Sequence, residues 1–330
     1  MITAHDLGRG RLVVGVPDGR PQRVLRVDAQ GMPSALIGRL LVGSYITGQD
    51  QVIVTAPGGL TADQRAGVRE VVDRLLGMSV VNDTPSGIEI QNFVDPTKYA
   101  LPRLLHRVAG VLRVELELCQ HSLAARDAAG LERLASLEEE VDQFYLLMAR
   151  QLLLSSDDPR IARDIDVASP HYQIGYRLVA KVLEMTGDLV FAMGNDLRQN
   201  LDAFERTSPS VAHELGLRIR WLHDLLELTM EGFTSLSVTV ANETLDRIAD
   251  CLPRTTSLGQ LVARSLDDHR LAVAAQRIVC NLSMAMEMLI IVNEVTINRR
   301  VEPDRSATSD TRVAMDGRAA APPPRPGGAR

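Results

Sequence analysis

Two pairs of acidic residues have the types and the spacing to bind one ligand together. Glu138 and Asp142 are four residues apart, and so are Glu184 and Asp188. On a helix this spacing places both carboxylates of a pair on one face, one turn apart. If the two helices face each other, four acidic side chains converge, and ions such as iron and zinc need at least four ligands. The spacing therefore predicts a candidate metal site for iron or zinc at these four residues.

Two simpler arrangements of the same residues remain open. The acidic side chains can all be solvated on an exposed helix face, where like charges at this spacing repel each other by about 0.2–0.5 kcal/mol. Glu138, however, shares a face with apolar Val141 and Tyr145, so burial would raise the pKa of its carboxyl group unless a positive charge lay nearby. Arg177 or Lys181 could supply that charge in a salt bridge, without any metal.

Motifs of the common enzyme classes are missing from the sequence. There is no Gly-x-x-x-x-Gly-Lys, Gly-x-Gly-x-x-Gly or Gly-x-Ser-x-Gly motif, and no two histidines have the spacing His-x-x-x-His. A di-iron carboxylate enzyme would need Glu-x-x-His on two helices, and no such pair occurs. The sequence favours a protein that is not an enzyme.

The second acidic pair lies in the stretch from Tyr176 to Asp196. It contains no proline, and its apolar side chains recur every three or four residues, which predicts a helix. The stripe that we expect to face a core differs from the acidic strip and consists of Leu183, Thr186, Val190, Met193 and Leu197.

The first hundred residues alternate between short apolar runs and helical patterns. Strands are predicted at 11–16, 23–28 and 51–56, a hairpin at 79–83 and 87–94, and helices at 33–47 and from a capping box at Thr61 and Gln64 to Gly77. Residues 23–97 are therefore expected to form a small α/β sandwich with its helices on one face.

The remainder of the chain has an almost wholly helical pattern. Helices are predicted near 98–127, 129–155, 170–204, 209–235, 238–252, 257–268 and 270–301, with breaks at Asp157-Asp158-Pro159, Ser169-Pro170, Ser208-Pro209 and Pro253. The fold class is therefore α+β and mostly helical. We expect two tandem three-helix bundles, at 98–205 and 206–302, and a disordered tail at 303–330, which is rich in Ala, Pro and Gly.

Composition restricts the compartment and the partners. The net charge of −6 and the aromatic content of 3% argue against a general nucleic-acid surface, so DNA is not an expected partner. The N-terminus lacks the apolar run of a signal peptide, and the most apolar segment, Leu282 to Val292, contains Glu287 and is too short to span a bilayer. We expect a cytoplasmic protein without a membrane span.

The helical stretches at 137–152, 176–196 and 291–299 resemble the PhoU regulators of phosphate uptake, particularly their archaeal branch. That family has tandem three-helix bundles with Glu-x-x-x-Asp motifs, which some members use to bind iron or zinc clusters. The resemblance implies a regulator of phosphate uptake and phosphate homeostasis that contacts the ATPase subunit of a phosphate ABC transporter.

Many archaeal relatives carry an AbrB-type DNA-binding hairpin before the α/β region. Residues 1–22 would then be a shortened remnant of that hairpin, and the alternative function is a transcriptional regulator.

Open strand edges at 23–28 or 87–94 also predict a homodimer.

Overall fold

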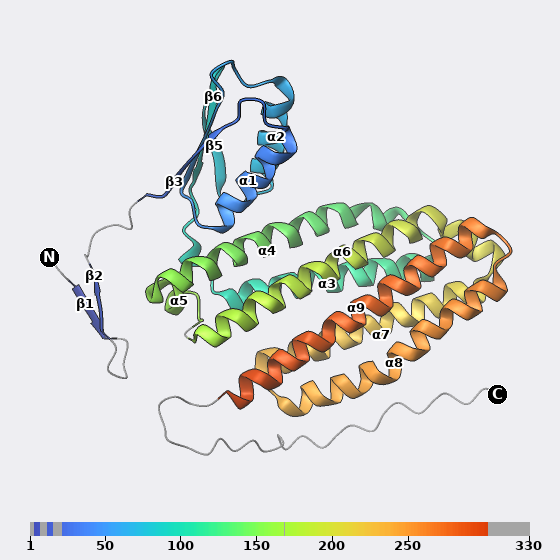
Figure 1. Ribbon diagram of the computed structural model, residues 1–330. Helices are drawn as coiled ribbons and strands as arrows, with labels where there is room; N and C mark the ends of the chain where they lie inside the picture. Colours follow the sequence, from blue (N-terminus) through green and yellow to red (C-terminus); the bar gives the residue numbers. More distant parts are fainter. Residues whose placement is uncertain (1–2, 7–11, 16–21, 168, 303–330) are drawn as a thin grey trace.

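The computed structural model describes residues 3–6, 12–15, 22–167 and 169–302. A small α/β domain packs on one side of a long array of helices (Figure 1). The predicted fold class, α+β and mostly helical, is confirmed. The predicted disordered tail at 303–330 lies outside the described residues.

The α/β domain contains a four-stranded sheet with the order β3-β4-β6-β5. Its strands are β3 (Val24–Asp28), β4 (Gln51–Thr55), β5 (Met78–Thr84) and β6 (Gly87–Asn92). β3 and β4 are parallel, whereas β6 is antiparallel to both β4 and β5. Helices α1 (Ser34–Ile46) and α2 (Ala62–Asp73) cover one face, as predicted (Figure 1). Alternate strand residues are buried beneath these helices, as expected for a sheet with one covered face: Val52, Val54, Ile88 and Ile90.

The strand order corrects one of the two edges predicted for dimerisation. β3 is an edge strand, but β6 lies between β4 and β5, so 87–94 offers no free edge. The second edge is β5, the first strand of the hairpin. Local sequence fixes a hairpin but not which of its strands joins the rest of the sheet, which is why this prediction was wrong. The homodimer itself stays a prediction.

The N-terminal segment contains one more strand than predicted. β1 (Thr3–Asp6) pairs antiparallel with β2 (Leu12–Gly15), and the two form a sheet separate from the four-stranded one. β2 matches the strand predicted at 11–16. The short and polar β1 has no alternating pattern by which it could be found.

Helices make up most of the described chain between residues 101 and 302. Their bounds are α3 (Leu101–Ala125), α4 (Leu134–Asp157), α5 (Pro159–Asp164), α6 (Pro170–Thr207), α7 (Pro209–Ser235), α8 (Val238–Ser265) and α9 (His269–Val301). Short 3-10 turns precede α3 and α4, at Pro96–Lys98 and Ala129–Arg133. Prolines occupy the first turn of α5, α6 and α7, where a missing N–H is harmless.

The break predicted at Pro253 is wrong, because α8 continues through it. An internal proline removes one helical hydrogen bond, at a cost of about 3 kcal/mol. Buried residues on both sides, Ile248 before the proline and Leu258 and Val262 after it, hold the two halves in the same core. Tertiary packing of α8 against α7 and α9 therefore overrides the local preference of proline.

One hydrophobic core extends through both predicted bundles, from Leu101 of α3 to Val295 of α9. The stripe predicted on α6 belongs to it, since Leu183, Val190 and Met193 are all at most 1% exposed. The α/β domain has its own core, on which Leu146 of α4 also packs. Helix α4 therefore contributes to both cores.

Helix α9 is long and apolar enough to cross a membrane, with a mean hydropathy of 1.6 over its most apolar window. Half of that window is buried inside the protein, where α9 packs on α6, α7 and α8. A core helix of a soluble protein has the same properties. The prediction of no membrane span stays a prediction.

Gly77 joins α2 to β5 in a conformation that favours glycine. The helix ends at Asp73, four residues before the predicted end, and Gly77 has a φ of +85°. A Cβ atom there would also clash with the side chain of Val94.

Replacing Gly77 with alanine is expected to lower the free energy of unfolding by about 2 kcal/mol, from left-handed strain plus the clash. Urea denaturation of the two proteins measures this loss. Gly43→Ala, where a Cβ would meet nothing within 4 Å, is the control and is expected to be neutral or stabilising. Equal stability of the Gly77 variant and the wild type would contradict the prediction.

Candidate metal centre

Helices α3, α4 and α6 pack against one another (Figure 1). The acidic pairs lie on two of them, Glu138 and Asp142 on α4 and Glu184 and Asp188 on α6. Gly187 of α6 permits the close approach, because a Cβ atom there would lie 3.2 Å from the side chain of Leu112 on α3 and 3.3 Å from that of Val141 on α4. Gly187 precedes Asp188 in the chain. The small residue therefore brings the carboxylates of α4 and α6 together.

Three of the four predicted site residues form a compact group. Glu138, Asp142 and Asp188 each offer one carboxylate oxygen, and these oxygens lie within 4.8 Å of one another. Glu138 and Asp142 are partly buried, whereas Asp188 is exposed. We call these three residues the carboxylate cluster. They present only oxygen ligands, which suit hard cations.

Glu184, the fourth predicted residue, lies outside the cluster. Its side chain is only 11% exposed, and both of its oxygens accept hydrogen bonds from Lys181 Nζ, at 2.7 and 2.5 Å. Burial raises the pKa of Glu184, and Lys181 opposes that shift. Glu184 thus has an internal counter-ion one turn away on its own helix.

Lys181 and Arg177, the two residues considered as salt-bridge partners of Glu138, have other partners in the structure. Lys181 pairs with Glu184, and Arg177 lies over the ring of Tyr145, 5.0 Å from its centroid. Burial raises the pKa of Glu138, and the positive charge that opposes this rise is Arg74, just after α2.

Arg74 links the α/β domain directly to the cluster. Its Nη2 atom lies 2.9 Å from the Oδ2 atom of Asp142. The sequence did not indicate this pair, because it depends on how the α/β domain docks on α4.

A further carboxyl group, on α3, interacts electrostatically with the cluster. Glu115 of α3 is fully buried, and neither of its oxygens has a hydrogen-bond partner. Burial, with smaller contributions from the charges of Glu138 and Asp188, raises the pKa of Glu115 to about 8. At neutral pH this side chain carries a proton in the metal-free protein.

The pKa values of Glu138 and Asp188 in the cluster are raised as well. Burial raises the pKa of Glu138, with Asp142 and Asp188 adding to the shift, and burial and then Asp142 raise the pKa of Asp188. Their mutual repulsion is only partly balanced by Arg74 and Lys181. A cluster with this excess of negative charge favours binding of a cation.

The sequence held a signal for Glu115 that was missed. Val108, Leu112 and Cys119 are buried and recur at helical spacing, and Glu115 occupies the same stripe. A charged residue at a core position of an amphipathic helix is unusual and marks a candidate functional group.

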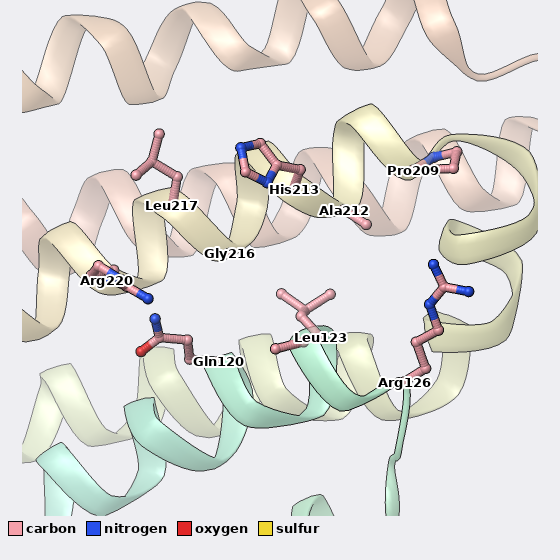
Figure 2. A pocket seen from close by; sticks show the side chains of 10 residues that line it. Gln120, Leu123, Arg126, Pro209, Ala212, His213, Gly216, Leu217 and Arg220 are labelled. Atoms are coloured by element: carbon pink, nitrogen blue, oxygen red, sulfur yellow. The ribbon is translucent and has the colours of Figure 1, made fainter. Parts of the chain in front are cut away.

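A second candidate is a groove of 510 Å³ between the C-terminal end of α3 and the start of α7. Arg126, His213 and Arg220 give it a basic character (Figure 2). With the Gln120 amide turned so that its oxygen faces Arg220, that oxygen accepts two hydrogen bonds, at 2.8 and 2.9 Å. Arg126 also has an interaction partner within the protein. The carboxylate cluster, which has an excess of unbalanced charge, is therefore the stronger candidate site.

Comparison with known proteins gives no relative for this chain. No protein-family model, no curated protein and no solved structure matches it significantly.

Proposed function

We propose that this chain is a cytoplasmic, non-enzymatic regulator of phosphate uptake that contacts the ATPase subunit of a phosphate ABC transporter. The proposal includes a cation site at Glu138, Asp142 and Asp188, which binds iron, zinc or another divalent ion. Cation binding serves regulation in this scheme and not turnover.

The carboxylate cluster is the observation that carries the proposal. The resemblance to PhoU proteins implies acidic pairs that meet between helices, and Glu138 and Asp142 of α4 do lie beside Asp188 of α6. The buried and unpartnered Glu115 is a second observation in favour of a cation, because buried polar atoms in native proteins nearly always have a partner.

Metal analysis tests the cation site. The protein is purified without a metal-affinity resin, and its metal content is measured before and after loading with Mn²⁺, Fe²⁺ or Zn²⁺. We expect about one ion per chain in the wild type, and a loss of at least tenfold in affinity for Glu138→Gln and Asp188→Asn. Glu140→Gln is the matched control on α4, because Glu140 pairs with Arg107 away from the cluster. A wild type that binds no ion, or variants that bind as tightly as the wild type, would remove the site.

Partner capture tests the regulatory function. Immobilised wild-type protein is incubated with the ATPase subunit of a phosphate ABC transporter from the same organism, and with the ATPase of an unrelated ABC transporter as control. Selective capture of the first and a changed ATPase rate are expected. No capture, with or without added cation, would refute the contact.

Arg74 is expected to compete with the cation for Asp142. Replacing Arg74 with glutamine removes a positive charge 2.9 Å from this ligand. Because the pair is half exposed, we expect a gain in cation affinity of about two- to fivefold, the equivalent of about 0.4–1 kcal/mol. Isothermal titration with Mn²⁺ measures it. Arg69→Gln, on α2 five residues before Arg74 but paired with Asp83, is the control. Weaker binding in the Arg74 variant would contradict this competition.

An AbrB-type transcriptional regulator is the alternative function. The hairpin of β1 and β2 favours it, because this segment has two paired strands where a single remnant strand was predicted. Fluorescence anisotropy with promoter DNA, comparing the full chain with a variant lacking residues 1–22, decides between the two. Binding that is lost with the segment would support the alternative, and absence of binding by the full chain would reject it.

A further inference from the structure

We infer that Glu115, and not Glu184, is the fourth protein ligand of the divalent cation held by Glu138, Asp142 and Asp188. This inference rests on the proposed cation site and adds a residue that the Glu-x-x-x-Asp spacing does not contain. It also removes one that the spacing predicts.

The cluster alone is an incomplete site. Three carboxylates give three protein ligands if each binds through one oxygen, whereas four to eight ligands surround the common divalent cations. Water can fill some positions, but a cation that enters a partly buried site leaves part of its hydration shell behind. Glu115 and Glu184 are the two carboxyl groups that could replace the lost water ligands.

Glu184 is already satisfied. Lys181 Nζ donates to both of its oxygens, at 2.7 and 2.5 Å, so a cation would have to break an ion pair whose carboxylate side chain is only 11% exposed. Lys181 is held in addition by the ring of Tyr145, 5.0 Å from its nitrogen. Binding through Glu184 would leave this ammonium group beside the incoming cation.

Glu115 is in the opposite condition. It is fully buried, both oxygens lack a hydrogen-bond partner, and the charges that act most strongly on it are those of Glu138 and Asp188. A carboxyl group without a partner in the core is unfavourable unless a ligand satisfies it. Because Glu115 is outside the group whose oxygens lie within 4.8 Å, we expect its side chain to rotate toward Glu138 and Asp188 when the ion binds.

Cation binding by four proteins tests the inference. Mn²⁺ is titrated into the wild type, Glu115→Gln, Glu184→Gln and the control Glu117→Gln, and the free ion is followed by electron paramagnetic resonance. Glu117 lies on the same helix as Glu115, with 62% of its side chain exposed. We expect Glu115→Gln to weaken binding at least tenfold, Glu184→Gln by less than threefold, and Glu117→Gln not at all.

A second variant and a second measurement guard against a folding defect. Glu115→Leu fills the same space with an apolar group and should also lose binding, while circular dichroism reports the folded state of both variants. The increase in melting temperature on addition of Mn²⁺ should disappear in both Glu115 variants and persist in Glu184→Gln.

The outcomes separate this inference from the proposed site. If the wild type binds Mn²⁺ and Asp188→Asn abolishes binding, but Glu115→Gln binds like the wild type, Glu115 is not a ligand while the site stands. A larger loss for Glu184→Gln than for Glu115→Gln would also overturn the inference. If the wild type binds no cation, both the site and the inference fail.

Discussion

Replacing Arg150 with leucine is expected to lower the free energy of unfolding by about 3 kcal/mol. Arg150 lies at the contact between the α/β domain and the helices. Arg150 lies on α4 and is 1% exposed. Its Nη1 atom donates hydrogen bonds to the backbone oxygens of Tyr45, at 2.6 Å, and Gln49, at 3.0 Å. Its guanidinium group also lies over the ring of Tyr45, 5.1 Å from the centroid.

The loss has two physical causes. Leucine removes the donor that Arg150 gives to the carbonyl oxygen of Gln49 and one of the two donors to that of Tyr45, which still accepts from the N–H of Gly48. It also removes the counter-charge of Asp50, which lies 3.5 Å from Arg150. An unsatisfied buried acceptor costs about 1–3 kcal/mol, and a lost hydrogen bond to a charged group costs about 1.5–3 kcal/mol, partly offset here by the burial of an apolar side chain.

Urea denaturation measures this effect, and hydrogen exchange locates it. Amides of α1 and of residues 47–51 should exchange faster in the variant, while the core of α7 to α9 should not change. Arg107→Leu is the control, because Arg107 is 61% exposed and pairs only with Glu140 at the surface, so its expected change is within about 0.5 kcal/mol. A similar small change in both variants would show that Arg150 does not anchor the domain.

The contact between the two domains could not be predicted from the sequence, as three residues of α4 show: Asp142, Leu146 and Arg150. They are spaced four residues apart on α4, and each contacts the α/β domain or its core: Asp142 binds Arg74, Leu146 packs on the core and Arg150 binds Tyr45. The spacing can be found in the sequence, but nothing local shows that a second domain covers this face. Asp142 was therefore found as a possible ligand and missed as a docking residue.

Features that depend on neighbouring residues could be predicted. The capping box of Thr61 and Gln64 is present with both hydrogen bonds, at 2.9 and 3.2 Å. The predicted hairpin turn is also present, at Thr-Pro-Ser-Gly between β5 and β6. The packing of three helices could not be predicted in the same way. Glu184 and Asp188 are the two members of one Glu-x-x-x-Asp motif, and the sequence does not distinguish them as ligands. In the structure Glu184 pairs with Lys181, whereas Asp188 joins the cluster. The difference depends on which turn of α6 faces α4, and only the packed fold determines that.

The metal-free protein is expected to be several kcal/mol more stable at pH 5 than at pH 8, chiefly because of Glu115. Its pKa rises from an ordinary 4.5 to about 8 on folding. A raised pKa means that the folded state holds a proton that the unfolded state has already lost. The resulting stabilisation is present at low pH and is lost progressively as the pH rises from 4.5 to 8.

The size of this effect follows from linkage. Each pH unit in the window is worth about 1.4 kcal/mol, so Glu115 alone contributes on the order of 4–5 kcal/mol across it. Glu138, Glu184 and Asp188 have raised pKa values as well, so their contributions have the same sign. Because they are more exposed than Glu115, solvent screening makes these contributions smaller.

Urea denaturation in the presence of a chelator, at pH 5, 6, 7 and 8, measures the dependence. Glu115→Gln carries no titrating proton and should flatten the curve, and its stability should exceed that of the wild type most at pH 8. Glu117→Gln, on the exposed face of α3, should keep the slope of the wild type. Parallel curves for the wild type and Glu115→Gln would show that Glu115 does not titrate in this window. Added Mn²⁺ should reduce the slope for the wild type, because a cation bound to the carboxylate cluster stabilises the ionised carboxyl groups that destabilise the metal-free protein at high pH.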